Sequence, residues 1–131
     1  MLRGFCLVLG LATATVAHAA PPAVAVAEIN YLLDSVAASG CEFYRNGTWY
    51  DSTRAQAHVR FKYDALAASG HIDTADDLVK KVATGSSLTG QQYEVRCGGQ
   101  APTTTREWLS AMLARYRARA APRAVRGAPG T

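Results

Sequence analysis

Apolar side chains recur at every third or fourth position in four stretches of the chain, which is the period of an α-helix with one buried face. The clearest stretch ends at Gly40, a residue that readily adopts the left-handed conformation found at helix ends; its apolar residues are Val26, Ile29, Leu32, Leu33 and Val36. The pattern predicts helices over residues 23–39, 52–68, 74–84 and from 104 to about 120.

Polar residues mark the start of three of these helices. Ser52 is a suitable N-cap for the second helix, because its hydroxyl can accept a hydrogen bond from a free backbone N–H. Thr74 with Asp77, and Thr104 with Glu107, have the three-residue spacing of a capping box. The last two helices are therefore expected to begin at these threonines.

The segment from Cys41 to Tyr50 has the pattern of a β-hairpin. Asn46-Gly47 favours a tight turn with positive φ at both central residues, and the flanking stretches are rich in aromatic residues. A two-residue loop sets three cross-strand pairs. They are Arg45 with Thr48, Tyr44 with Trp49, and Phe43 with Tyr50.

A third strand is predicted over residues 92–97, where Tyr93, Val95 and Cys97 alternate with polar residues. This face is expected to pack inward, together with Cys41 and Phe43. The chain is thus predicted to be a single α+β domain over residues 20–120, with about four helices on a small three-stranded antiparallel sheet. Residues 121–131 are poor in apolar side chains and predict a disordered basic tail.

The first 19 residues have the organisation of a bacterial signal peptide. Arg3 precedes an apolar run over residues 4–16, and the segment closes on the small-residue site Ala17-His18-Ala19. The apolar run is shorter than the roughly 20 residues that a membrane-spanning helix needs. We expect cleavage after Ala19 and a mature protein in the periplasm or outside the cell, without a membrane span.

Export determines the state of the cysteines. Cys6 lies in the predicted signal peptide, so the mature chain keeps Cys41 and Cys97. In an oxidising compartment a single pair has one intramolecular connectivity. We therefore predict the disulfide Cys41–Cys97.

The formal net charge of +4 is unevenly distributed. Residues 20–105 hold seven basic and nine acidic side chains, whereas six arginines and one glutamate follow from Arg106 onward. Arg115, Arg117 and Arg119 alternate around a helix and form no one-sided patch, which favours a solvated tail over an anion-binding surface. Charge alone does not indicate a nucleic-acid partner.

Catalytic and metal-binding patterns are weak. His58 and His71 have no ligand spacing around them, and His71 with Asp73 has no evident third ligand, so we expect no metal or other cofactor. A serine-dependent hydrolase remains an alternative. It would use Ser86 or Ser87 with His58 or His71 as base, oriented by Asp64 or Asp73, although no nucleophile motif supports it.

The hairpin is the stronger candidate for binding. Tyr44 and Trp49 form an aromatic pair that is either covered by a helix or left as a platform for a glycan or a partner chain. The polar turn at residues 86–90 is expected beside the hairpin tip. The candidate binding residues are Tyr44, Arg45, Asn46, Trp49, Ser86 and Ser87.

Several short motifs together resemble the YfeK-like family of small exported bacterial proteins. The motifs are Ser39-Gly40-Cys41-x-Phe43-x-Arg45-Asn46-Gly47-x-x-Tyr50, Ala57-His58, Ser86-Ser87-Leu88-Thr89-Gly90-x-x-Tyr93-x-Val95-Arg96-Cys97 and Trp108-Leu109. The resemblance covers residues 29–113 and implies a periplasmic protein, but it brings no activity, cofactor or catalytic residue. The sequence as a whole predicts a non-enzymatic binding or interaction module with an envelope partner, a protein or a glycan.

Overall fold

The computed structural model describes residue 14 and residues 20–126, with side chains up to residue 121. The predicted signal peptide and its cleavage site therefore lie outside the described residues, apart from Ala14 and Ala20. The elements, in chain order, are α1 (Ala23–Ala38), β1 (Glu42–Arg45), β2 (Thr48–Tyr50), α2 (Ser52–Ala68), α3 (Ala75–Asp77), the π-helix η1 (Leu78–Val82), β3 (Glu94–Arg96), β4 (Thr103–Thr104) and α4 (Thr105–Arg126).

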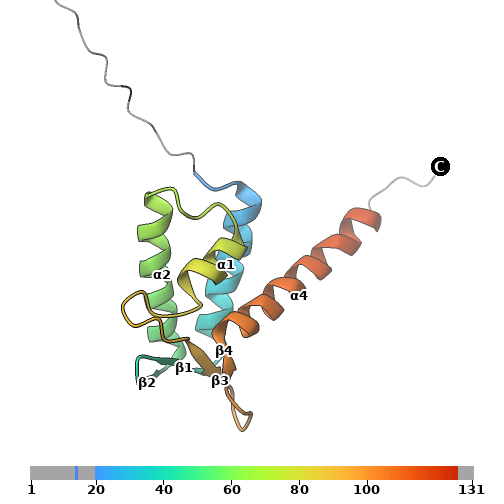
Figure 1. The fold of residues 1–131 in the computed structure, drawn as a ribbon. Helices are drawn as coiled ribbons and strands as arrows, with labels where there is room; N and C mark the ends of the chain where they lie inside the picture. Colours follow the sequence, from blue (N-terminus) through green and yellow to red (C-terminus); the bar gives the residue numbers. More distant parts are fainter. Residues whose placement is uncertain (1–13, 15–19, 127–131) are drawn as a thin grey trace, which may run out of the picture.

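The hairpin forms in the predicted register. Phe43 pairs with Tyr50, Tyr44 with Trp49, and Arg45 with Thr48. Asn46 and Gly47 both have positive φ, as the tight turn requires. The helices gather on one side of the sheet, with α1 and α2 next to each other (Figure 1).

The sheet has four strands, so the prediction of three was wrong in number. All pairs are antiparallel, and the order is β2-β1-β3-β4. The additional strand β4 has only two residues, Thr103 and Thr104, which pair with Val95 and Glu94. Such a short polar segment has no alternation to reveal it, and its threonines also match a helix cap.

The inward face of the sheet forms the centre of the core. Phe43 and Val95 are buried and directly opposed across β1 and β3. Fully buried side chains from α1 and α4, among them Leu33 and Leu109, pack in the same cluster. The predicted disulfide Cys41–Cys97 is present and joins the start of β1 to the residue after β3.

Helix boundaries differ from the prediction in two places. Asp51, rather than Ser52, caps α2, because its carboxylate accepts a hydrogen bond from the Arg54 N–H at 2.8 Å. The third helix begins with the predicted capping box of Thr74 and Asp77, but only one turn is α-helical before the wider η1 follows.

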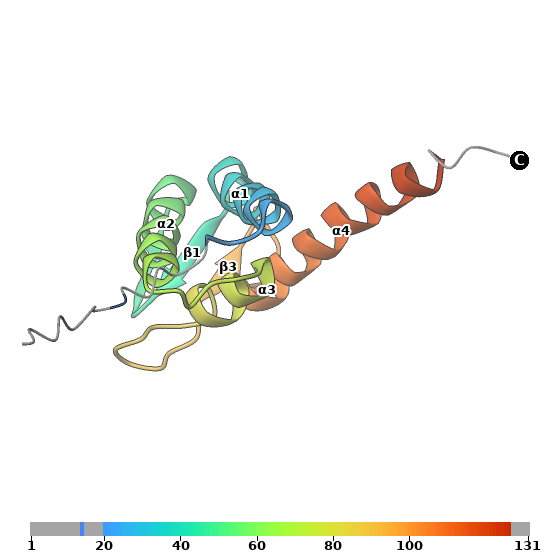
Figure 2. The same ribbon diagram turned by 90° about the horizontal axis from the view of Figure 1, so that it is seen from above.

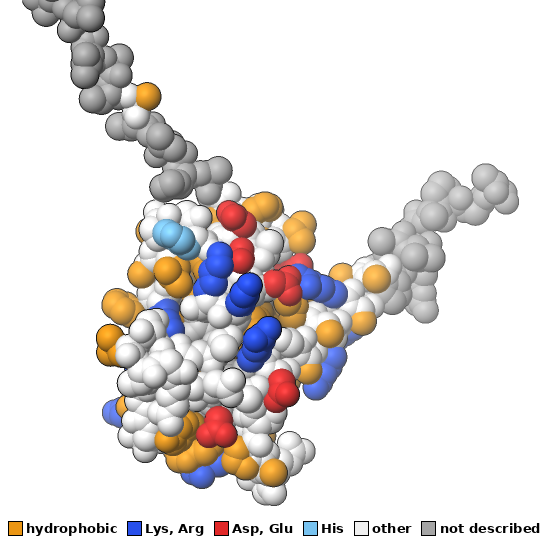
Figure 3. Space-filling model, in the orientation of Figure 1, with side chains coloured by type: hydrophobic (Ala, Val, Ile, Leu, Met, Phe, Trp, Pro, Cys, Tyr) orange, Lys and Arg blue, Asp and Glu red, His pale blue; other side chains and the backbone are white. Residues whose placement is uncertain are grey.

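Helix α4 leaves the body of the protein at a steep angle (Figure 2). Near the body, Tyr116 stacks on Tyr31 of α1 with ring centroids 4.6 Å apart. Arg117 pairs with the buried Glu28 at 2.7 Å and with Asp76 at 2.8 Å. Basic and acidic side chains lie intermixed over the face of the molecule in Figure 3.

The helix continues to Arg126, past the expected end near residue 120. Residues 121–126 are therefore helical rather than part of a disordered tail, and residues 127–131 lie outside the described residues. Within the described part of the chain, no helix combines the length and apolar character needed to cross a membrane.

Candidate functional site

A small pocket lies between the hairpin and α2, on the helix side of the sheet. It encloses about 30 Å³, and we call it the hairpin pocket. Its polar lining comes from Arg45 of β1, Arg54 and His58 of α2, Tyr93 before β3 and Thr105 at the start of α4. Four separate segments thus contribute polar groups to one small space, which only the folded chain brings together.

A chain of hydrogen bonds crosses the pocket. The Arg45 Nη1 group lies 2.9 Å from His58 Nδ1, and His58 Nε2 lies 3.3 Å from the Tyr93 hydroxyl oxygen. The same Arg45 Nη1 group also lies 3.4 Å from His58 Nε2, so it contacts both ring nitrogens. His58 is thus hydrogen-bonded to both Arg45 and Tyr93.

Lys62 completes this network from the next turn of α2. Its ammonium group donates to the carbonyl oxygens of Val82 at 2.9 Å and Gly85 at 3.1 Å. It also lies 3.4 Å from the Tyr93 hydroxyl oxygen. The Tyr93 hydroxyl thus accepts from Lys62 and shares a hydrogen bond with His58.

Thr105 has an unusual position. Its side chain is only 3% exposed, and its hydroxyl has no hydrogen-bond partner among the described residues. The backbone N–H of Thr105 donates to the Tyr93 carbonyl at 2.9 Å, which fixes the residue against the pocket. A buried hydroxyl without a partner is costly, and such groups in folded proteins usually bind a water or a ligand.

The cations near the pocket are not neutralised by carboxylates. Ion pairs of the described residues involve Lys81, Arg96 and Arg117, whereas Arg45, Arg54 and Lys62 form none. The Arg45 guanidinium instead lies over the Tyr50 ring, 4.8 Å from its centroid. The site therefore has an excess of positive charge.

Burial and this charge shift the titration of three groups, and the pKa of Lys62 is lowered, first by burial and then by the charge of Arg45. The pKa of His58 is lowered from 6.5, first by burial and then by the charges of Arg45 and Lys62. The pKa of the Tyr93 hydroxyl is raised, because burial disfavours the phenolate. At neutral pH the pocket thus contains a neutral imidazole and a protonated phenol.

The lowered pKa of His58 predicts a loss of stability in mild acid. Unfolded His58 takes up a proton near pH 6.5, whereas the folded form resists protonation, so the unfolded state binds more protons below that pH. We expect the free energy of unfolding to decrease from pH 7 to pH 5. Asp77 and Glu107, whose pKa values are lowered from 3.8 and 4.5, lose their contributions mainly at lower pH.

Urea unfolding measured between pH 5 and pH 7.5 tests this expectation, with His58→Gln as the comparison. Glutamine keeps an acceptor for Arg45 but does not titrate. The pH dependence in this window is expected to be smaller in H58Q, and equal slopes in the two proteins would contradict the assignment.

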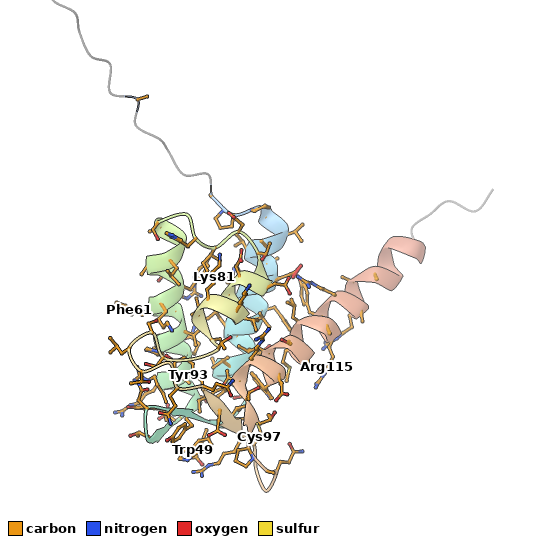
Figure 4. The ribbon with its side chains drawn as sticks, in the orientation of Figure 1. Trp49, Phe61, Lys81, Tyr93, Cys97 and Arg115 are labelled. Carbon is orange, nitrogen blue, oxygen red and sulfur yellow. A yellow bond between two sulfur atoms is a disulfide. The ribbon has the colours of Figure 1, made fainter. Side chains whose placement is uncertain are left out.

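The outer aromatic pair is not covered by a helix. Trp49 lies on the side of the sheet away from Tyr93 (Figure 4). Its ring lies 5.3 Å from the Tyr44 ring, and the Arg96 guanidinium lies 4.0 Å from its centroid. Arg96 is also paired with Glu42. Part of the Trp49 surface is therefore occupied by neighbouring side chains, and the ring stays partly exposed.

The hairpin tip and the polar turn meet as expected, but their side chains bind each other. The Asn46 amide nitrogen donates to Ser86 Oγ at 3.2 Å, and the Thr89 hydroxyl donates to Asn46 Oδ1 at 2.8 Å. Ser86 is buried, and its oxygen also accepts from the backbone N–H groups of Leu88 and Thr89. Ser87 is exposed. Asn46 and Ser86 thus have a structural role.

Two substitutions separate the roles of Asn46. Asn46→Gly keeps the positive φ of 48° accessible but removes both side-chain bonds, which we expect to lower the free energy of unfolding by about 1 kcal/mol. Asn46→Ala adds the strain of a positive φ, for a total of about 2 kcal/mol. Chemical denaturation measures both, and equal losses would show that the backbone conformation contributes little.

The hydrogen bonds of the two histidines do not bring together the residues of the alternative hydrolase site. His58 binds Arg45 and Tyr93, and His71 binds Ser69 at 2.8 Å. Neither histidine is hydrogen-bonded to Ser86 or Ser87 in the described part of the chain. Within the same residues, no group of three histidine, cysteine or carboxylate side chains is placed to hold a metal ion.

Of the predicted site residues, the pocket includes Arg45 and is bordered by Tyr44. Arg54 and Lys62 were not predicted, although Arg54 precedes and Lys62 follows His58 by four residues, the spacing of one helix face. Thr105 had no signal, because the run Thr103-Thr104-Thr105 is already explained by capping of α4.

The fold and the pocket define a small disulfide-linked α+β protein with a cationic pocket. The chain belongs to the family of unknown function DUF5329, whose model matches residues 23–117. It is also 34% identical over 94 residues to the uncharacterized protein YfeK of Salmonella typhimurium strain LT2, an alignment that covers 71% of this chain and 77% of that protein. This agrees with the family resemblance found in the sequence motifs. No solved structure matches the chain.

Proposed function

We propose that this protein is an exported, non-enzymatic binding module and that its ligand site is the hairpin pocket. The observation that carries the proposal is Thr105, which lines the pocket and whose buried hydroxyl has no hydrogen-bond partner among the described residues. A bound ligand would satisfy this group.

The lining supports binding rather than catalysis. Both ring nitrogens of His58 are already hydrogen-bonded, and within the described part of the chain none of its hydrogen-bond partners is a serine, threonine or cysteine. A general base needs a proton donor within hydrogen-bond reach on the substrate or nucleophile. The outer face around Trp49 is a weaker candidate, because Arg96 covers the ring.

The disulfide and the signal-peptide pattern support a location outside the cytoplasm. The full chain, expressed with its own first 19 residues and recovered from the bacterial periplasm, is expected to begin at Ala20 and to lack two hydrogens. Intact mass spectrometry without reductant measures both. Recovery from the cytoplasm with residues 1–19 retained would contradict the assignment.

Binding is tested on the same periplasm-derived protein. Backbone amide NMR spectra are recorded with and without a small-molecule extract of bacterial periplasm, and shifts are expected at Arg45, Tyr93 and Thr105. Ala55 is buried at the pocket wall, so Ala55→Leu should abolish these shifts by filling the space.

Ala57→Leu is the matched control, because Ala57 lies on the same helix but is exposed. It should leave the shifts unchanged. Shifts that are absent in the natural protein, or that survive A55L, would exclude the pocket as the binding site.

A further inference from the structure

We infer that the ligand of the hairpin pocket is an organic carboxylate with an apolar body, its carboxylate held by Arg45, Tyr93 and Thr105. This inference rests on the proposed function and names the class of ligand. It follows from four properties of the pocket: its hydrogen-bond donors, its charge, its size and its apolar wall.

The first property is a surplus of donors. The Tyr93 hydroxyl accepts from Lys62 and shares one hydrogen bond with His58, and because the hydroxyl can rotate it can turn its proton toward a ligand. Arg45 uses one of its nitrogens toward His58, and guanidinium groups have five N–H donors. The Thr105 hydroxyl has no partner in the described part of the chain. The pocket therefore requires a ligand that accepts several hydrogen bonds at once.

The second property is charge. Arg45 and Arg54 line the pocket, and Lys62 is hydrogen-bonded to Tyr93, which also lines it. None of these three cations is paired with a carboxylate among the described residues. The pocket also lies at the N-terminus of the 22-residue α4, where the helix dipole favours a negative charge. An anionic acceptor is thus preferred over a neutral carbonyl.

The third property is size. The pocket is partly open to solvent and its volume of about 30 Å³ has room for roughly two or three water molecules, so it takes the head group of a ligand and not its whole body. A carboxylate is a small planar head group that can bind a guanidinium through both oxygens.

The rest of the wall is apolar. Phe43, Ala55 and Val59 are buried beside the polar groups, and the Tyr50 ring lies under the Arg45 guanidinium. Free inorganic anions gain nothing from such a surface. A hydrocarbon or aromatic body attached to the carboxylate buries apolar area there and adds affinity.

The test is an amide NMR titration of the periplasm-derived protein with hexanoate, hexanamide, acetate and inorganic phosphate. Hexanoate is expected to shift Arg45, Tyr93 and Thr105 saturably. Hexanamide, which has the same shape without the charge, should bind at least about tenfold more weakly, and acetate should also bind more weakly because it lacks the apolar body.

Variants identify the groups involved. Arg45→Gln is expected to weaken hexanoate binding about tenfold or more, and Arg60→Gln, on α2 but outside the pocket lining, should leave it unchanged. Thr105→Val has nearly the same shape. It should weaken binding about two- to tenfold and at the same time raise the midpoint of thermal unfolding, because an unpartnered buried hydroxyl is removed.

The outcomes separate the inference from the proposed function. Equal affinity for hexanoate and hexanamide, or tighter binding of phosphate than of hexanoate, would overturn the carboxylate assignment. Shifts caused by the periplasmic extract would still support the pocket as a binding site in that case. If no probe binds but the extract shifts the pocket residues, the ligand class is wrong. If neither the probes nor the extract shift them, both proposals fail.

Discussion

The double replacement Cys41→Ala, Cys97→Ala is expected to lower the free energy of unfolding by about 4 kcal/mol. The two residues are 56 positions apart, so the bond restricts a long segment of the unfolded chain. Loss of this restriction increases the entropy of the unfolded state. The expected loss is comparable with the whole net stability of many small domains. Urea denaturation followed by circular dichroism measures it.

Reduction provides the matched experiment. The natural chain, unfolded in the presence of a reductant, should lose stability by an amount similar to that of the double variant. The double replacement is used because it leaves no free thiol. A loss below about 1 kcal/mol in both experiments would indicate that the unfolded chain keeps residual structure around the pair.

The sheet was largely predictable because its information is local. Asn46-Gly47 determines the turn, the turn determines the register, and the alternation in residues 92–97 determines which face points inward. The fourth strand was not predictable. Thr103 and Thr104 pair with β3 only because α4 brings them back to the sheet, and no property of the two threonines requires this pairing.

The third helix shows a similar limit. Thr74 and Asp77 predicted its start correctly, since both residues of the capping box lie in one turn. Its wider continuation depends on distant groups. Lys62 of α2 binds the Val82 carbonyl, and Thr84 binds the Val79 carbonyl at 2.7 Å, so these acceptors are satisfied without an α-helical continuation.

The candidate site was only partly predictable. Residue type suggested His58 as a base for a serine, whereas the fold places it between Arg45 and Tyr93. The hairpin tip was correctly placed beside residues 86–90, but the contact between Asn46 and Ser86 is internal. Pocket residues from four segments meet only through tertiary packing, which a local pattern in one sequence does not encode.

Phe43→Ala is expected to have the second large effect, with a loss of about 3 to 5 kcal/mol in the free energy of unfolding. Phe43 is 6% exposed, opposes Val95 across the sheet, and meets the Trp108 ring edge-on with centroids 5.7 Å apart. Its removal leaves a cavity where the sheet, α4 and the hairpin pocket meet. Urea denaturation again measures the loss.

The neighbouring Tyr44→Ala is the matched control, because alternation places Tyr44 on the other face of β1. Tyr44 is half-buried and stacks on Trp49, so a loss of about 1 kcal/mol is expected. Since Phe43 also lines the pocket, F43A should weaken hexanoate binding, measured without urea on protein whose circular dichroism spectrum is that of the folded chain. Equal losses in the free energy of unfolding for F43A and Y44A would mean that both faces of β1 contribute equally to stability. That result would contradict a core on one side of the sheet.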